Sequence, residues 1–279
     1  MTAAVEPRER TVDARGLTFH YTEWGEPDAP NVLLLHGISS TCRIWDPVAQ
    51  ALQDRYHVIA LDQRGHGDTS WPEDGAYAAA DFVGDVEALV DLWGMDTLDI
   101  IGLSMGGMNG IAYAAHHPDR IKHLISIDIR PAITREKRPG RGLDKHIADH
   151  GHPELPDHES ALKLARLTNQ TTPDGPLKHR LQHLLKQLPN GKWVNKHDAR
   201  VSYYWEPANL WDELPKVTAP VLIVRGGKSQ VLQDNVIDDM LAAFPNAQAA
   251  TIEEAGHTVP EDRTEEFIAA IEPFLASEA

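Results

Sequence analysis

The sequence predicts an α/β protein in which helices cover a mostly parallel sheet. Three observations predict this class. Short runs rich in Val, Leu and Ile are apolar at every position, which suits strands buried on both faces of a parallel sheet. Amphipathic segments alternate with these runs, as in units that wrap a sheet with helices. One long segment, residues 131–215, interrupts the alternation and contains no convincing strand.

The expected strands follow the chain in order. The segment RTVDARGLTFHYTEWG predicts an N-terminal hairpin, with Gly16 near its turn. Buried strands are expected at residues 31–37, 57–62, 98–104, 121–129 and 220–226, and a weaker strand at residues 247–256.

The expected helices lie between these strands. Residues 81–93 place their apolar side chains at the spacing of one helical face. Further helices are expected at residues 108–120, with Pro118 just past the likely end, and at residues 236–244 and 264–275. Within residues 131–215, the segments HESALKLARLTNQ and LKHRLQHLLKQL have helical patterns. We therefore expect residues 1–130 and 216–279 to form the core, and residues 131–215 to form a helical cap.

Composition limits the partners of the chain. The 42 acidic and 26 basic residues give a formal charge of -16, which disfavours nucleic acid and anionic membrane surfaces. Cys42 is the single cysteine, so no internal disulfide is expected. The N-terminus lacks the apolar core of a signal peptide, and no run approaches the ~18 apolar residues of a membrane span. These features predict a cytoplasmic monomer or homodimer that acts on a small molecule.

A candidate nucleophile lies where an expected strand meets an expected helix. The segment Gly102-Leu103-Ser104-Met105-Gly106 fits the pattern G-x-S-x-G in the strand–helix context that makes this pattern informative. Such a turn is sharp, and glycines on either side of the serine remove side chains that would clash. The sequence therefore predicts that Ser104 is exposed at the carboxyl edge of the sheet.

An attacking serine needs a base, and the base needs an orienting acid. His257 lies in the loop between the last strand and the last helix, which returns to the same edge of the sheet. Asp128 ends the strand after the nucleophile helix and is the preferred acid; Asp234, beyond the penultimate strand, is the alternative. Ser229 could add a hydrogen bond near the acid or the base.

Two backbone donors are expected to bind the oxygen of a tetrahedral intermediate. The residue after the nucleophile, Met105, should supply one N–H group. Ile38, in the loop that follows the strand at 31–37, should supply the other. In that loop, Gly37 would permit a close backbone approach and His36 would order the chain.

Nearly the whole chain resembles the α/β-hydrolase family. The segments that carry the resemblance are LLLHGISS, LDQRGHGDTS, GLSMGG, SIDIRP, VLIVRGGKS and AGHTVPED. The resemblance implies that Arg64, Gly65, His66 and Gly67 order a tight loop without contacting substrate. The GGKS turn and Asp128 resemble an esterase branch that takes its acid from the strand following the nucleophile helix. The sequence departs from many relatives in lacking an aspartate at Ser229 or Gln230.

These observations predict a serine hydrolase that cleaves a carboxylic ester, lactone or thioester of a small, largely apolar substrate through an acyl-enzyme. The same residues would also serve a C–C bond hydrolase, a perhydrolase or haloperoxidase-like enzyme, or a ligand-binding protein without turnover. No cofactor or metal is expected, because no paired carboxylate or cysteine frames the clustered histidines as a zinc site requires. Those histidines are His146, His150, His152, His158, His179 and His183.

Overall fold

The computed structural model describes residues 6–133 and 140–277 of the chain. Its main sheet has eight strands in the order β1-β2-β4-β3-β5-β6-β9-β10. The strands are β1 (Arg8–Ala14), β2 (Leu17–Trp24), β3 (Asn31–Leu35), β4 (His57–Leu61), β5 (Leu98–Leu103), β6 (Ile121–Ile127), β9 (Val221–Gly226) and β10 (Ala247–Ile252). β2 pairs antiparallel with β1 and β4, and all the other neighbours are parallel. The expectation of a mostly parallel sheet is therefore confirmed.

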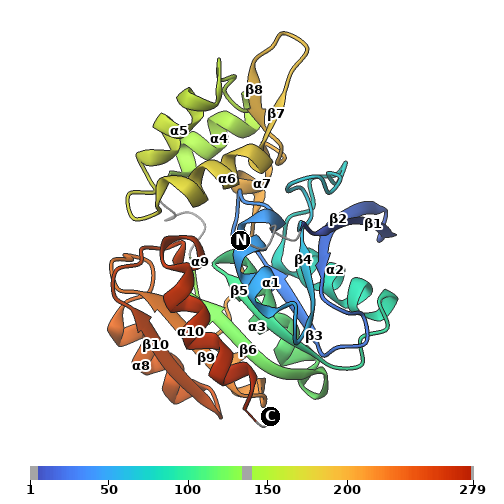
Figure 1. Ribbon diagram of the computed structural model, residues 1–279, viewed down its shortest axis with the longest axis vertical. Coiled ribbons are helices and arrows are strands. Elements are labelled where there is room, and N and C mark those ends of the chain that lie inside the picture. The colour runs from blue at the N-terminus through green and yellow to red at the C-terminus, as the bar shows by residue number, and fades with distance from the viewer. Residues whose placement is uncertain (1–5, 134–139, 278–279) are drawn as a thin grey trace.

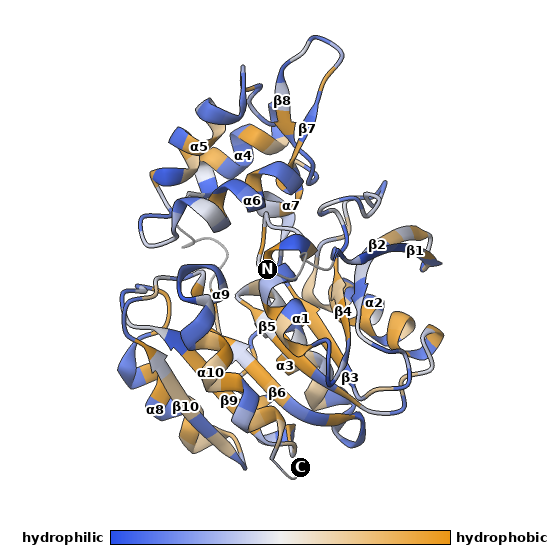
Figure 2. Cartoon of the chain, in the orientation of Figure 1, coloured by the Kyte–Doolittle hydropathy of each residue, from blue (hydrophilic) through white to orange (hydrophobic). Residues whose placement is uncertain are grey.

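Helices cover both faces of this sheet (Figure 1). The helices α1 (Asp46–Leu52) and α10 (Thr264–Leu275) share one apolar cluster, whereas α2 (Ala79–Leu92), α3 (Met105–His116) and α8 (Asp234–Ala243) share the other. Along β3, Val32 and Leu34 belong to the first cluster, and Leu33 and Leu35 belong to the second. This alternation follows from the two-residue period of a strand. Figure 2 shows the central strands as largely hydrophobic along their length.

Residues between β6 and β9 form a second group of elements beyond one end of the sheet (Figure 1). These are α4 (Arg141–His150), α5 (His158–Arg166), α6 (Asp174–Leu184), β7 (Leu185–Gln187), β8 (Trp193–Asn195) and α7 (Val201–Tyr204). Ala161, Leu177, Leu181 and Leu185 give this group a small apolar core of its own. The group is tied to the main body through α6, which packs against the short helices η1 (Cys42–Trp45) and α9 (Val259–Asp262).

Two details of the sequence-based assignment are wrong. Residues 131–215 do contain strands, because β7 and β8 form an antiparallel hairpin. The helix expected over LKHRLQHLLKQL therefore ends at Leu184, and its last residues form β7. Strands of three residues are too short to show an apolar alternation. The turn residues Asn190-Gly191, with φ of 82° at Gly191, were the available signal for a hairpin.

Candidate active site

Ser104 occupies a strained position between β5 and α3. Its backbone has φ of 53° and ψ of -118°, a region that residues with a side chain rarely adopt. The N–H group of Ser104 donates to the Ile127 carbonyl at 2.9 Å, which fixes this turn against β6. A Cβ atom on Gly106 would overlap the Leu35 carbonyl, and one on Gly102 would overlap the Gly106 carbonyl. The tight turn therefore depends on glycine on both sides of the serine.

Asp128 and His257 are joined by a short hydrogen bond. Asp128 directly follows β6, has φ of 49° and is fully buried. Its Oδ2 atom lies 2.6 Å from His257 Nδ1. The Ser229 hydroxyl donates to the same oxygen at 2.5 Å and accepts the Val231 N–H at 3.1 Å. The Ser229 oxygen accepts the Val231 N–H, so the single proton of the Ser229 hydroxyl points at Asp128.

The alternative acid has a different partner. Asp234 is the first residue of α8, is exposed, and forms an ion pair with Arg225. Arg130, an obvious candidate partner for Asp128, instead donates to the backbone carbonyls of Gln230 and Val231. Of these two carboxylates, only that of Asp128 contacts His257.

Ser104 and His257 line the same cavity, which has a volume of about 340 Å³. Both residues are described by the structure, and no hydrogen bond joins the side chains of Ser104 and His257. Contacts between a nucleophile and its base are often long before substrate binds. The remaining lining residues come from the loop after β3, from β5, from α5 and the turn that follows it, from α6 and from the loop before α9: Gly37, Ile38, Ser39, Ser40, Leu103, Ala165, Thr168, Asn169, Arg180, Leu181, Leu184 and Thr258.

The loop after β3 lines this cavity and is held in place by His36. The buried His36 ring donates from Nδ1 to the Gly37 carbonyl at 2.7 Å and accepts the Gln63 N–H at Nε2. Burial lowers the pKa of His36, which keeps the ring neutral, as this pair of contacts requires. In a trans peptide the carbonyl and the following N–H point in opposite directions. His36 therefore turns the Ile38 N–H away from itself. A Cβ atom on Gly37 would lie 3.3 Å from Ser104 Cβ, so this loop runs close to the serine.

Met105 begins α3, and the first N–H groups of a helix have no acceptor within the helix. The Met105 amide therefore has no acceptor within the helix. It lies directly beside Ser104 in the chain. The positive end of the α3 dipole adds to the attraction for negative charge at this point.

The sequence analysis missed several residues around the site. Gln63 donates from its side chain to the His36 carbonyl at 2.7 Å, and Asn109 donates to Gln63 at 2.8 Å. The position of Gln63 directly after a strand, in LDQRGHGDTS, was the available signal. Asn109 gave no comparable signal, because it is a single polar residue in a helix that is otherwise apolar.

Arg180 is a buried cation on α6, on the side of the cavity opposite the sheet. It donates to Glu261 and to Asn169, each at 2.8 Å. Burial raises the pKa of Glu261 to about 7, and the charge of Arg180 opposes that shift. The pair joins α6 to α9, the short helix that follows the loop carrying His257. No motif in the sequence marked either residue, because their proximity depends on how α6 packs against α9.

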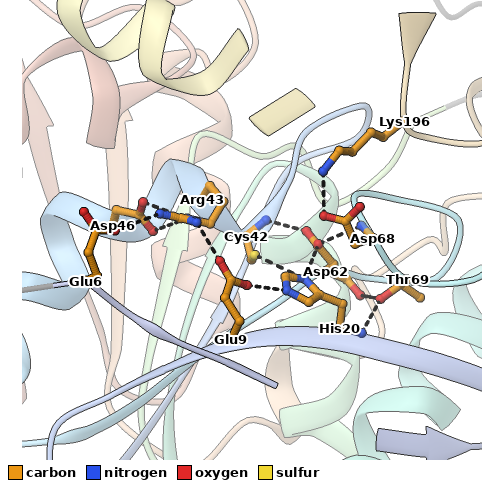
Figure 3. Close-up of polar contacts among 10 residues, drawn as sticks. All are labelled: Glu6, Glu9, His20, Cys42, Arg43, Asp46, Asp62, Asp68, Thr69 and Lys196. Atoms are coloured by element: carbon orange, nitrogen blue, oxygen red, sulfur yellow. Dashed lines mark hydrogen bonds and ion pairs between the residues drawn. The ribbon is translucent and has the colours of Figure 1, made fainter. Parts of the chain in front are cut away.

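A polar network near the N-terminal hairpin links several distant segments (Figure 3). Asp62 accepts the Cys42 N–H and lies 2.7 Å from His20 Nδ1. Glu9 lies between His20 and Arg43, and Arg43 also binds Asp46. Burial alone would lower the pKa of His20, but hydrogen bonds with Asp62 and Glu9 raise it to about 9. The network thus holds β1, β2, η1 and the start of α1 together.

One contact among the clustered histidines could not be seen from the sequence. A single carboxylate, that of Asp46, lies beside His179 and His183, although it is far from them in the sequence. Separately, none of the described helices is both long enough and apolar enough to cross a membrane.

Comparisons with known proteins agree with the fold. The family model for the alpha/beta hydrolase fold matches residues 30–264. An esterase of Mycobacterium tuberculosis is 28% identical over 260 residues, which cover 90% of this chain and 84% of the relative. An esterase of Escherichia coli is 28% identical over 245 residues, covering 88% and 92% of the two chains. The crystal structure of E-2-(acetamidomethylene)succinate hydrolase is similar with a TM-score of 0.87 and 25% identity, covering 98% of this chain and all of the other.

Proposed function

The chain belongs to the alpha/beta hydrolase fold family, and from this premise we propose that it hydrolyses a carboxylic ester with Ser104 as the nucleophile. The observation that carries the proposal is the hydrogen bond between Asp128 and His257 at the rim of the cavity that holds Ser104. The esterase names of the relatives from Mycobacterium tuberculosis and Escherichia coli support the choice of an ester bond.

In the proposed reaction, His257 takes the proton of the Ser104 hydroxyl as the serine oxygen attacks the ester carbonyl. Asp128 holds the proton on His257 Nδ1, so that Nε2 is the basic nitrogen, and stabilises the imidazolium that forms. When the carbon–oxygen bond breaks, the imidazolium gives its proton to the leaving alcohol. A water molecule, deprotonated by His257, then attacks the acyl-enzyme and releases the acid together with the regenerated serine.

The N–H groups of Ile38 and Met105 are proposed to bind the oxyanion in both tetrahedral intermediates. Donors fixed in advance at such a position act more strongly than water, because they need no reorganisation during the reaction. Loss of one donor of this kind typically costs about 10²–10³ in rate.

The proposed substrate has a small, largely apolar acyl group. The cavity volume of about 340 Å³ is near the lower end for small-molecule sites. Its apolar lining comes mainly from Ile38, Leu103, Leu181 and Leu184. We propose that residues 131–215 act as the cap over this site, since α5 and α6 supply much of its lining.

Turnover of p-nitrophenyl acyl esters of graded chain length tests this function. We expect hydrolysis to be fastest with short acyl chains and to fall at least about 10³-fold in Ser104→Ala, because the nucleophile is lost. Ser40→Ala is the matched control. Ser40 lines the same cavity, and its buried hydroxyl has no partner among the described residues, so turnover should change less than a few-fold.

Undiminished turnover in Ser104→Ala would contradict the proposed nucleophile. Tight ligand binding by the wild-type chain without any turnover would instead identify a binding protein.

A further inference from the structure

Three potential metal ligands meet where the cap touches the core. His179 and His183 lie one turn apart on α6, so both rings are on the same side of the helix. Asp46, the first residue of α1, faces them from the core. One ligand atom from each residue lies within 4.8 Å of the other two, and His179 Nε2 is 2.8 Å from Asp46 Oδ2. From this arrangement we propose that Asp46, His179 and His183 bind a Zn²⁺ ion that joins α6 to the core.

The chemistry of the donors favours zinc over other common cations. Zn²⁺ binds imidazole nitrogen and carboxylate oxygen, and three protein ligands leave a fourth position for water. Mg²⁺ and Ca²⁺ prefer ligand sets made of oxygen. The His183 side chain forms no hydrogen bond to any other residue in the described ranges, so its nitrogens are available to a metal.

The carboxylate ligand is already held in place by neighbouring residues. Arg43 Nε donates to both Asp46 oxygens, at 3.0 and 2.8 Å. The same guanidinium binds Glu9 at 2.7 Å, so its charge is shared between two carboxylates (Figure 3). A carboxylate oxygen has more than one lone pair, and outer residues that orient a ligand are typical of metal sites. Arg43 therefore orients the Asp46 carboxylate, but its single positive charge does not cancel the negative charge of both carboxylates that it binds.

A second cluster of similar composition is less suitable. His20, Cys42 and Asp62 also bring their ligand atoms within 4.8 Å of one another. However, Asp62 already accepts hydrogen bonds from the Cys42 and Asp68 amides, and burial raises the pKa of the Cys42 thiol well above its usual value. A metal there would have to displace the bonds that fix the chain, whereas the Asp46 cluster is only partly buried.

The proposed ion would restrain the helix that covers the cavity. Arg180, Leu181 and Leu184 on α6 line that cavity, and they lie between or beside the two histidines in sequence. A metal bond from α6 to α1 would therefore limit the separation of the cap from the core.

Titration calorimetry of the full chain with ZnCl₂ tests the site. We expect one high-affinity equivalent in the wild-type chain and at least about a tenfold weaker affinity in His183→Asn and in His179→Asn, because each removes one ligand. His146→Asn is the matched control. His146 and His150 also lie one turn apart with their rings 4.4 Å apart, but they belong to neither metal-capable cluster found in residues 6–133 and 140–277.

Hydrogen exchange gives a second measurement. Zn²⁺ should slow the exchange of α6 amides in the wild-type chain and not in His183→Asn. Circular dichroism of each variant shows whether it is folded. A high-affinity equivalent that persists in both His183→Asn and His179→Asn overturns the proposal, as does its loss in His146→Asn. Binding is measured without substrate and should persist in Ser104→Ala, so this result is independent of the proposed esterase activity.

Discussion

At the residue scale, Asp128 and Ser229 form a small unit behind His257. The carboxylate is fully buried and receives hydrogen bonds on Oδ2 from both His257 and Ser229. The other oxygen, Oδ1, is buried without a hydrogen-bond partner among the described residues, so the two bonds on Oδ2 alone fix the carboxylate. The Asp128 side chain is therefore held in one orientation, and the proton on His257 stays on the nitrogen that faces it.

Replacing the acid should separate its role from that of Asp234. We expect Asp128→Asn to lower kcat by about 10⁴, because the amide no longer holds the productive tautomer of His257. Asp234→Asn should change kcat less than about twofold, because Asp234 is exposed and pairs with Arg225. Steady-state kinetics on one p-nitrophenyl ester compares the two variants. Equal losses, or a larger loss in Asp234→Asn, would mean that the acid is assigned to the wrong residue.

At the element scale, the turn between β5 and α3 depends on how closely β3 approaches it. A side chain at Gly106 would overlap the backbone of Leu35 and His36, which belongs to or directly follows β3. Backbone atoms of a central strand cannot move aside without disturbing the ladder on both sides of it. The geometry of Ser104 is thus a consequence of the packing of two elements.

We expect Gly106→Ala to lower the free energy of unfolding by about 3 kcal/mol or more and to abolish turnover, since overpacking of a buried site is among the costly mechanisms. Gly142→Ala is the control, because Gly142 lies in the exposed α4 helix with nothing within 4 Å of an added Cβ. There alanine should stabilise the helix by up to about 1 kcal/mol. Urea unfolding measures both changes. A Gly106→Ala chain as stable as the wild type would show that the backbone has room to shift.

The elements of the sheet could be predicted because each carries its own local signal. The run NVLLL of β3 is apolar at four of five positions and continuous, and burial on both faces explains why. The short helix α1 was not predicted, because seven residues provide too little periodicity. The hairpin of β7 and β8 was missed for a related reason: Lys186 and Gln187 are exposed, and only pairing with β8 makes them a strand.

At the scale of the whole molecule, the residues of the site also divide into those that a local pattern predicts and those that it does not. Ser104, Asp128 and His257 each follow a strand of the sheet, so topology alone predicts that they meet at one edge. Arg180 and Glu261 come together only through the packing of α6 against α9, which no local pattern encodes. The same is true of Asp46, which lies far from His179 and His183 in the sequence.

Buried histidines should give the whole molecule a stability maximum near neutral pH. Hydrogen bonds with Asp62 and Glu9 overcome the effect of burial and raise the pKa of His20 to about 9. Its contribution is fully present below the unfolded value of about 6.5 and is lost as the pH rises through 9. Burial instead lowers the pKa of His66 to about 3, and also lowers those of His36 and His197. These rings gain protons only on unfolding, so stability is lost as the pH falls below about 6.5.

The substitution His20→Gln should remove most of the loss of stability at alkaline pH and leave the loss at acid pH unchanged. Between pH 6.5 and 9 we expect the free energy of unfolding of the wild type to fall by up to about 3 kcal/mol, from the displacement of one pKa. In His20→Gln most of this fall should be absent, and the part that stays comes from other groups with a raised pKa, such as His179, whereas both chains should lose stability together between pH 6 and 4. Urea midpoints at several pH values measure the two limbs. An unchanged alkaline limb in His20→Gln would place its origin in another group, such as His179, whose pKa is raised by its hydrogen bond with Asp46.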